Sequence, residues 1–269
     1  MNLENKVFVV TGAGNGIGRE VALELLRRGG HVAAVDLSPK GLAETASLAG
    51  APTSGLSLHA MNITERGAVE ALPARVLEEH SQIDGLVNVA GVIHRFVPIK
   101  ELSVEEIERV MSVNFWGTLY MVKAFLPELL QRPAASLVNV SSMGGLVPSP
   151  GQGAYGASKA AVKLFTETLY AELRDTNIKV TCVFPGSVGT DILSNSGVTL
   201  DTSKIAAPNG KAPKMTSPQD AGGQIVNAIA SGAVRVLIGT DARGVDRLGR
   251  LSPTRAIEIV ADRVKVLIG

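Results

Sequence analysis

Tyr155 and Lys159 are the two residues whose types and spacing most clearly suggest chemistry. They lie four residues apart at the start of a segment rich in helix-forming residues, 153–175. Residues four apart on a helix share a face, so the phenol and the ammonium group are presented together. A free phenol, with a pKa of about 10, is a poor base at neutral pH, and a nearby ammonium group lowers that pKa. We therefore expect Tyr155 to transfer a proton and Lys159 to tune it, although a lone tyrosine at a helix start would simply be a packed aromatic residue.

A glycine-rich loop near the N-terminus has the pattern of a phosphate-binding site. Gly12, Gly16 and Gly18 follow a predicted strand and open a predicted helix. Glycines let the turn close tightly and let a pyrophosphate approach the backbone, where free N–H groups at the helix start face the anion. Asp36 then ends the second predicted strand, 18 residues after Gly18. This context favours a dinucleotide-binding loop over the alternative of a purely structural turn.

The residue that predicts the choice of dinucleotide is Asp36. A carboxylate at this strand end can accept hydrogen bonds from the ribose hydroxyls of adenosine, and it repels a 2′-phosphate. No arginine follows it, since the next residues are Leu37 and Ser38, and Asn15 occupies the loop position where a basic residue could meet that phosphate. We expect NAD rather than NADP. The alternative is that Asp36 serves only as a turn or helix cap beside Ser38.

The elements that must position these residues alternate along the whole chain. Strands are predicted at 6–10, 31–36, 56–61, 85–90, 136–141, 178–184 and 234–239. Helices are predicted at 17–28, 39–49, 65–80, 103–131, 153–175, 218–230 and from Ser252 onward. Most strands are apolar on both faces, which indicates a parallel sheet covered by helices on each side. The pattern predicts one doubly wound α/β domain over residues 1–269 with seven parallel strands. Pro127 predicts either a break near Phe115 and Trp116 or a kink at the proline itself.

The bulk composition excludes several classes of protein. With 26 basic and 25 acidic residues the net charge is +1, so no nucleic-acid partner is expected. The single cysteine, Cys182, cannot form an intrachain disulfide and suits a reducing cytoplasm. The sequence has neither a signal-peptide pattern nor an apolar run of about 18 residues, so we expect no membrane span and a cytoplasmic location. No metal site is predicted.

Several motifs follow one another in an order that resembles the short-chain dehydrogenase/reductase family. They are T-G-x-x-x-G-x-G from Thr11, N-V-A-G at 88–91, Asn114, Ser142 with Tyr155-x-x-x-Lys159, and P-G-S-V-G-T at 185–190. The resemblance covers residues 5 to about 240. It departs from the family at Val89, where an asparagine is usual, and at Asn62, where an aspartate commonly touches the adenine. The resemblance implies a Rossmann-like fold and an NAD(H)-dependent oxidoreductase that interconverts an alcohol and a ketone or aldehyde.

The same resemblance assigns roles to individual residues. Tyr155 is the general acid or base, Lys159 also holds the nicotinamide ribose, Ser142 bonds the substrate oxygen, and Asn114 holds a water that relays protons to the lysine. The backbone of Val188 and the hydroxyl of Thr190 contact the nicotinamide carboxamide. The full set of implied cofactor contacts is Gly12, Asn15, Gly16, Ile17, Asp36, Leu37, Asn62, Ile63, Asn88, Ala90, Gly91, Tyr155, Lys159, Pro185, Gly186, Val188 and Thr190.

The substrate region is less sharply defined by the sequence. The coil-like stretch 191–216 is expected to be a lid. The family positions near the substrate are mostly apolar and favour an apolar secondary alcohol or ketone: Ile93, His94, Phe96, Met143, Val147, Ser187 and Leu193. His94 either orients a polar group or is an exposed loop histidine without a role; the second interpretation is favoured.

Two further expectations concern assembly and the C-terminus. The helices at 103–131 and 153–175 carry small and apolar residues on more than one side, which predicts a homo-oligomer, a tetramer or a dimer. The helical extension at 241–269 either packs on its own domain or a neighbouring subunit, which is favoured, or lies on a membrane surface. Two alternatives to the enzyme remain open: a non-catalytic NAD-binding regulatory protein, because fold does not fix function, and a nucleotide-sugar epimerase-like enzyme.

Overall fold

The protein is built on a sheet of seven parallel strands. A computed structural model describes residues 1–50, 55–198 and 215–264. The strands lie in the order β3-β2-β1-β4-β5-β6-β7, and all neighbours are parallel. Their bounds are β1 (Val7–Thr11), β2 (His31–Asp36), β3 (Leu56–Ala60), β4 (Gly85–Asn88), β5 (Ala135–Val140), β6 (Ile178–Pro185) and β7 (Arg235–Ile238). The predicted seven-stranded parallel α/β sheet is confirmed. The strand order reverses between β1 and β4, and ligands bind at such switch points, outside the carboxyl ends of the strands.

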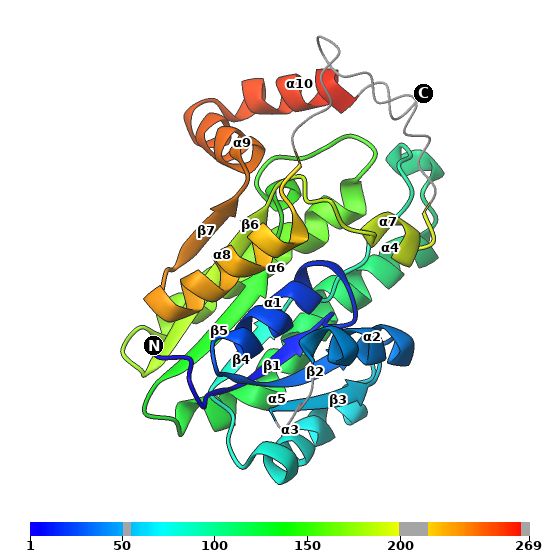
Figure 1. The fold of residues 1–269 in the computed structure, drawn as a ribbon. Coiled ribbons are helices and arrows are strands. Elements are labelled where there is room, and N and C mark those ends of the chain that lie inside the picture. Colours follow the sequence, from blue (N-terminus) through cyan, green and yellow to red (C-terminus); the bar gives the residue numbers. More distant parts are fainter. Residues whose placement is uncertain (51–54, 199–214, 265–269) are drawn as a thin grey trace.

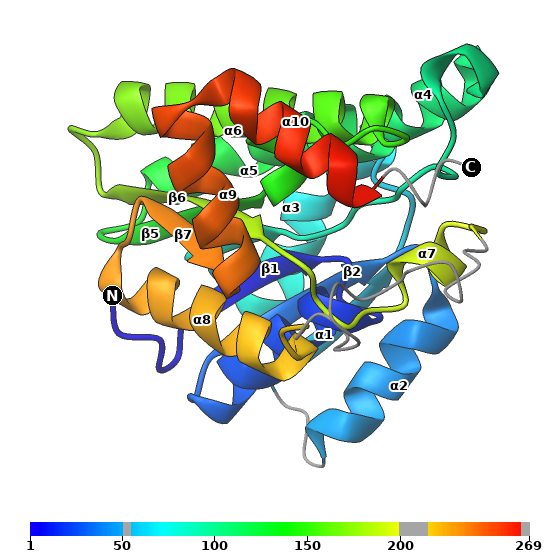
Figure 2. The ribbon, with the colours of Figure 1, turned by 90° about the horizontal axis from the view of Figure 1, so that it is seen from above.

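Helices cover both faces of the sheet, as Figures 1 and 2 show. One layer holds α1 (Gly16–Arg27), α2 (Pro39–Ala49) and α8 (Pro218–Ser231). The other holds α3 (Arg66–His80), α5 (Thr118–Leu130) and α6 (Gly153–Leu173). Side chains of β1 alternate between the two layers, with Val7 and Val9 in one apolar core and Phe8 and Val10 in the other. Burial on both faces explains why the strands are nearly continuous apolar runs.

The helix predicted at 103–131 contains an irregular middle. It runs as α4 (Val104–Met111), a π-helical turn η2 (Ser112–Gly117) and then α5. Ser103 and Glu106 form a capping box at its start. The predicted break near Phe115 and Trp116 is therefore a π turn, while Pro127 lies inside α5, which continues to Leu130. π turns are rare and often lie at functional sites.

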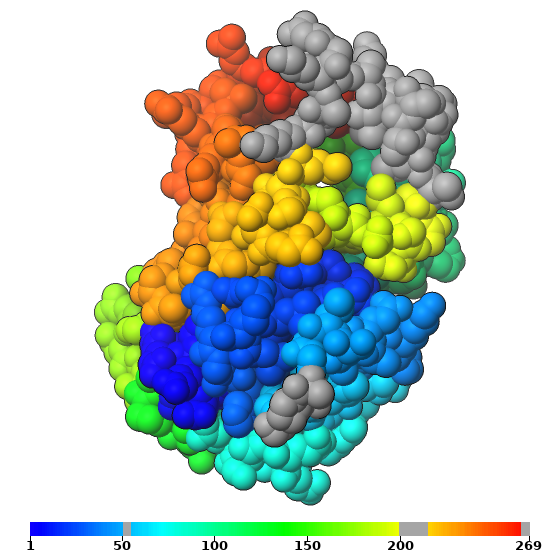
Figure 3. Space-filling view, in the orientation of Figure 1, coloured from blue at the N-terminus to red at the C-terminus, as the bar shows by residue number. Residues whose placement is uncertain are grey.

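Short elements and a C-terminal pair of helices complete the described chain. They are η1 (Ile99–Glu101), η3 (Met143–Gly145), α7 (Ile192–Asn195), α9 (Thr240–Leu251) and α10 (Pro253–Val264). Sequence patterns did not identify α7, and they gave the C-terminal extension as helical without separating α9 from α10. Figure 3 shows α9 and α10 as a projection from the body of the molecule. Most of the expected lid at 191–216 lies outside the described residues; α7 belongs to its described beginning. In the part of the chain that the structure describes, no helix is long and apolar enough to cross a membrane.

A small cluster of histidines surrounds Ser57 on β3, at one edge of the sheet. The hydroxyl of Ser57 lies 2.8 Å from Nε2 of His59 and 2.7 Å from Nε2 of His80. The ring of His31 lies 6.1 Å from that of His80. Burial lowers the pKa of both His59 and His80, and Glu79 partly opposes this effect. Both rings are therefore held toward the neutral form.

Candidate active site

The glycine loop after β1 has a backbone that side chains could not follow. Gly12 has a φ of +70°, and a Cβ there would lie 2.9 Å from the backbone of Ala90. A Cβ on Gly18 would collide with the carbonyl of Gly12. The hydroxyl of Thr11 accepts hydrogen bonds from Val89 N (3.1 Å) and Ala90 N (3.2 Å), which fixes this loop against the one after β4. The two loops therefore form one wall at the switch point of the sheet.

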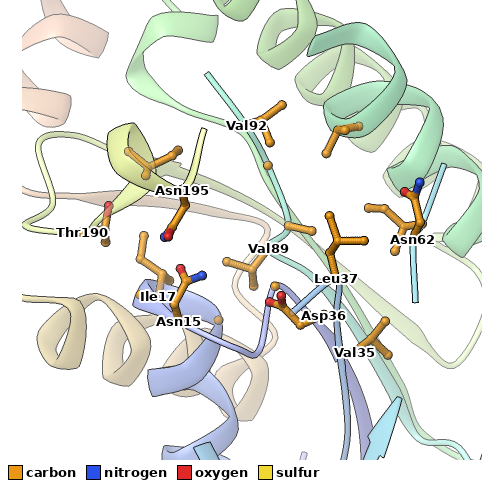
Figure 4. A pocket seen from close by; sticks show the side chains of 18 of the residues that line it. Asn15, Ile17, Val35, Asp36, Leu37, Asn62, Val89, Val92, Thr190 and Asn195 are labelled. Atoms are coloured by element: carbon orange, nitrogen blue, oxygen red, sulfur yellow. The ribbon is translucent and has the colours of Figure 1, made fainter. Parts of the chain in front are cut away.

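A cavity opens beside this wall, at the carboxyl ends of β1, β2 and β4 (Figure 4). Most of the expected cofactor contacts line it: Gly12, Asn15, Gly16, Ile17, Asp36, Leu37, Asn62, Ile63, Ala90, Gly91 and Thr190. The cavity is also lined by residues that were not among the expected cofactor contacts: Val35, Met61, Val89, Val92, Val113, Ile192 and Asn195. Helix α1 begins at this cavity without a side-chain cap at Asn15, so its first N–H groups face the space where a pyrophosphate fits.

Both oxygens of the Asp36 carboxylate accept backbone hydrogen bonds. Oδ2 accepts from Gly14 N at 2.8 Å, and Oδ1 accepts from Ser38 N at 2.8 Å. The turn-capping role considered for Asp36 is thus present. It does not exclude the ribose role, because each carboxylate oxygen has further lone pairs and Asp36 lines the cavity. The two hydrogen bonds hold the carboxylate at the end of β2.

Arg19, which bonds the carbonyl of Gly14 in the glycine loop, is a basic side chain that could reach a 2′-phosphate, but it is already engaged. Its Nε donates to Thr45 Oγ1 at 3.0 Å, and its Nη2 lies 2.9 Å from a carboxylate oxygen of Glu44. Asn62, in turn, uses its side-chain oxygen to accept from Thr64 at 3.0 Å. The amide nitrogen of Asn62 is then the group that can face an adenine ring.

Tyr155 and Lys159 lie in the first two turns of α6, and Ser142 follows β5. Burial raises the pKa of Tyr155, and a hydrogen bond from Ser142 acts in the opposite direction. Lys159 is only 4% exposed, and burial lowers its pKa to about 8. Its Nζ donates to the carbonyl of Val140 at 3.0 Å. In the free protein burial therefore outweighs the lowering of the tyrosine pKa that the Tyr155–Lys159 spacing predicts.

Asn114 lies in the π turn and bonds the loop that follows β4. Its Oδ1 accepts from Val92 N at 2.8 Å, and its Nδ2 donates to Val92 O and to Ser158 Oγ, both at 2.9 Å. A Cβ on Gly91 would lie 3.1 Å from Nζ of Lys159 and 3.2 Å from Oδ1 of Asn114. Gly91 also lines the cavity, so it joins the cofactor cavity to the lysine and the asparagine.

Asn88 faces the interior rather than the cavity. Its Nδ2 donates to Asn139 Oδ1 at 2.9 Å, and Asn139 donates to Thr166 Oγ1 at 3.0 Å. These bonds join β4, β5 and α6 through fully or nearly fully buried polar groups. The expected contact between Asn88 and the cofactor therefore stays a prediction, and the structure gives this residue a positioning role.

The segment after β6 contributes a second wall. Thr190 lines the cavity, whereas Pro185, Gly186 and Val188 do not. Val188 pairs with Thr216 in an isolated bridge. The short helix α7 is held near this wall by Ser196, whose hydroxyl accepts from Ile93 N at 3.0 Å.

Near the expected substrate position, one interpretation is wrong. His94 is fully buried, not an exposed loop histidine. Its Nδ1 lies 2.7 Å from the carbonyl of Arg95, and its Nε2 has no hydrogen-bond partner among the described residues. Gln152, which the sequence analysis missed, donates from Nε2 to His94 O at 3.1 Å. The position of Gln152, three residues before Tyr155, is the signal that could have identified it.

Comparison with known proteins fits this arrangement. A family model described as short chain dehydrogenase matches residues 6–200. SadH of Mycobacterium tuberculosis, named an oxidoreductase, is 36% identical over 264 residues, 97% of this chain and 95% of the relative. A Burkholderia phymatum short chain dehydrogenase/reductase solved with NAD is 27% identical with a TM-score of 0.84 over 97% of both chains. A Burkholderia cenocepacia short chain dehydrogenase solved with NADP is 27% identical with a TM-score of 0.79, over 97% of this chain and 99% of that one. The family match, the parallel sheet and the ordered motifs agree, and this chain belongs to the short-chain dehydrogenase/reductase family.

Proposed function

We propose that this protein is an NAD(H)-dependent oxidoreductase that interconverts an alcohol and a ketone or aldehyde by hydride transfer. The observation that carries the proposal is the meeting of Ser142, Tyr155 and Lys159 next to the cofactor cavity. Gly91 lines that cavity and approaches the lysine ammonium group. A protein that only bound the dinucleotide would not need a buried lysine beside a half-buried tyrosine, because an ammonium group is costly to bury.

Each of the three residues has a defined task in this proposal. When bound, the nicotinamide supplies or accepts the hydride. Tyr155 takes the hydroxyl proton of the substrate as the alcohol is oxidised, and returns it in reduction. Ser142, which hydrogen-bonds Tyr155 in the free protein, holds the same substrate oxygen. Lys159, with a pKa of about 8, is mostly charged at neutral pH and favours the phenolate over the neutral phenol.

The cofactor proposed is NAD rather than NADP. The carboxylate of Asp36 is held at the cavity by two backbone hydrogen bonds, and a 2′-phosphate there would meet a like charge. The engagement of Arg19 with Glu44 supports the same choice, because it leaves that guanidinium group directed at a carboxylate. Since relatives of similar identity were solved with NAD and with NADP, the argument rests on these side chains.

The substrate proposed is an apolar secondary alcohol or the corresponding ketone. Ile93 and Val147, both expected near the substrate, are nearly fully buried apolar side chains. Arg95 is the basic residue closest to Ile93 along the chain. Its Nε lies 2.8 Å from a carboxylate oxygen of Glu106, with which it forms a salt bridge. An arginine so engaged is a poor ligand for a charged sugar or a phosphate.

Turnover with a panel of alcohols tests the proposal. NAD and NADP reduction is followed by absorbance with apolar secondary alcohols, sterols, hydroxyacyl esters and sugars. We expect reduction of NAD with an apolar alcohol and little or none with NADP. NAD binding without turnover of any alcohol would favour a regulatory protein instead. Isomerisation of a nucleotide sugar without net NADH release would favour an epimerase.

We further propose that the enzyme works in the cytoplasm. We also propose that residues 1–269 form one domain with a lid at 191–216.

For its assembly we propose a homo-oligomer, a tetramer or a dimer. Large apolar side chains are exposed on α4, η2 and α6, namely Val104, Trp116, Leu164 and Tyr170. Exposed apolar groups of this size favour contact with another copy. Sedimentation that showed only a monomer at micromolar concentration would contradict the oligomer.

A further inference from the structure

Asp241, in the first turn of α9, holds two segments of backbone together. Its Oδ2 accepts a hydrogen bond from Ser187 N at 2.6 Å. Its Oδ1 accepts from Ala242 N at 2.9 Å. The first bond reaches 54 residues back along the chain, into the segment that follows β6. A single carboxylate therefore accepts hydrogen bonds from the first turn of a helix and from a loop at the same time.

Two glycines leave room for this carboxylate. A Cβ on Gly186 or on Gly239 would collide with the side chain of Asp241. Gly239 also has a φ of +94°, which residues with a side chain rarely adopt. Both segments thus lack side chains where the carboxylate lies between them. The local backbone is shaped around Asp241 and not merely close to it.

The other bonds of the loop 185–190 are to backbone alone. Gly186 N donates to Ile238 O at 2.9 Å, and Gly189 N donates to Thr216 O at 3.0 Å. Thr216 N in turn donates to Ser187 O at 2.9 Å. Among the described residues, Asp241 is the side chain that completes this set of hydrogen bonds to the loop.

Helix α9 is itself anchored at several other points. Asp246 pairs with Arg235 at 2.6 Å and with Arg250 at 3.1 Å. The guanidinium group of Arg235 lies 4.2 Å from the centre of the Phe184 ring, on β6. A Cβ on Gly249 would lie 2.8 Å from Val147, so α9 also packs closely on the segment after β5. Because the contact between Gly249 and Val147 does not involve Asp246, α9 keeps an anchor when that carboxylate is changed, and Asp241 can transmit a fixed position to the loop.

We propose that Asp241 is a positioning residue for cofactor binding: it holds the loop 185–190 in the conformation that receives the nicotinamide half of NAD. The proposal rests on the proposed function, since it takes Val188 and Thr190 as the groups that contact the carboxamide. It makes the C-terminal helix α9 a part of the cofactor site rather than an appendage. Loss of the carboxylate frees Ser187 N and removes the side-chain anchor that the described residues give this loop.

Binding of two nucleotides to variants of Asp241 tests this proposal. NAD and ADP-ribose, which lacks nicotinamide, are titrated calorimetrically into the wild type, Asp241→Ala, Asp241→Asn and the control Asp246→Asn. The control removes charge from the same helix without touching Ser187. We expect Asp241→Ala to weaken NAD by at least tenfold and ADP-ribose by less than twofold. Asp241→Asn keeps one good acceptor and should fall between, and Asp246→Asn should stay within twofold for both.

Amide hydrogen exchange of the peptide 185–190 in the free protein gives a second readout. It should accelerate at least tenfold in Asp241→Ala and much less in Asp246→Asn. Equal weakening of NAD and ADP-ribose, or unchanged NAD affinity in a folded variant, would overturn the proposal. If Asp241→Ala does not fold, the same two measurements on the isosteric variant Asp241→Asn decide whether the proposal holds. If the wild type binds neither nucleotide, the proposed function fails, and the exchange rates alone decide whether Asp241 holds the loop.

Discussion

The two sides of the active site differ in the chemical groups that form them. On the cofactor side, the wall is backbone: Gly12 and Gly18 bring main chains into contact where no side chain fits. On the catalytic side, the wall is made of buried polar side chains, among them Asn114 and Lys159. The first side presents N–H groups to an anion without burying a charge. The second side buries an ammonium group and amides that must each find a partner.

This difference determines which kind of substitution damages each side. A glycine wall is lost by adding atoms, because any Cβ collides with backbone and forces the loop open. A wall of buried polar groups is lost by removing atoms, because a deleted partner leaves an unsatisfied group. Atoms added to the glycine wall should weaken cofactor binding. Removal of a buried polar group should lower turnover, and it should raise the free energy of unfolding where the group, like an ammonium group, is costly to bury. Four predictions test the contrast, from the largest expected effect to the smallest.

Tyr155→Phe removes the proton carrier from the catalytic side and keeps the ring. Turnover should fall by roughly 10²–10⁴-fold, the usual contribution of general acid–base catalysis. NAD affinity should change little, because the glycine wall is untouched. Tyr170, on the same helix and exposed, offers the matched control, and Tyr170→Phe should keep full activity. Near wild-type turnover by Tyr155→Phe would refute the catalytic assignment.

Asp36→Ala combined with Leu37→Arg alters the cofactor side without touching the chemistry. Removing the carboxylate ends the repulsion of a 2′-phosphate, and the exposed position 37 supplies a positive partner. The preference for NAD, which we expect to be at least tens of fold in the wild type, should move toward NADP. The ratio of kcat/KM for the two cofactors is the measurement. This ratio cancels any loss of stability from the hydrogen bonds that Asp36 accepts from Gly14 N and Ser38 N.

The single variant Leu37→Arg is the control for this switch. It adds the positive charge and keeps the carboxylate, so its preference should move less than that of the double variant. Equal efficiency of the wild type with NAD and NADP would show that Asp36 does not face the ribose, and the choice of NAD would then be wrong.

Lys159→Met should stabilise the free protein while abolishing activity. Burial lowers the pKa of Lys159 to about 8 from 10.5, so the folded state holds its charge at a cost. The free energy of unfolding should rise by about 1–3 kcal/mol at pH 7. The cost is complete below pH 8, where both states are protonated, and disappears toward pH 10.5, where both are neutral. The gain of the variant should therefore shrink over that interval in denaturant titrations.

Lys163, on the next turn of α6 and paired with Glu167, is the control for this measurement. Lys163→Met removes a more exposed ammonium group, so its effect on stability should be small and of either sign. A Lys159→Met variant that is no more stable than the wild type at pH 7 would show that burying the charged lysine does not lower the free energy of unfolding.

The histidine cluster around Ser57 belongs to neither wall, and we expect it to give the smallest effect. The folded pKa of His59 and of His80 lies below the unfolded value of 6.5, so the unfolded chain binds protons first as the pH falls. Stability is thus complete above pH 6.5 and is lost below it, as the pH approaches the folded values. Thermal melts at pH 7 and pH 5.5 should show this loss, and His80→Gln should reduce it. A melting temperature that is the same at both pH values would contradict the assignment of neutral histidines.

Most of the glycine wall of this site could be predicted from the sequence, but only part of the wall made of buried polar side chains could be. Glycine spacing and strand ends are local patterns, so the loop at Gly12 and the end of β2 at Asp36 were found directly. The buried state of His94 was not, because it depends on Gln152 from a distant segment. Helix α9 was not separated from α10, since TDARGVDRLGRL is rich in charge and glycine and contains few apolar residues. The bond from Asp241 to Ser187 spans 54 residues, and no local pattern reports it.

The π turn at Ser112–Gly117 also limits how the length of this chain can vary. Such a turn holds one residue more than an α-helix does over the same rise. Deleting a residue from a regular stretch of helix rotates everything after it by about 100°, the angle per residue of an α-helix. In α4 that rotation would turn Phe125 and Leu129, both fully buried, away from the core. Within the π turn, the same deletion restores regular winding and leaves α5 in register. A one-residue gap in an alignment is therefore expected at the π turn and not in the helices on either side of it.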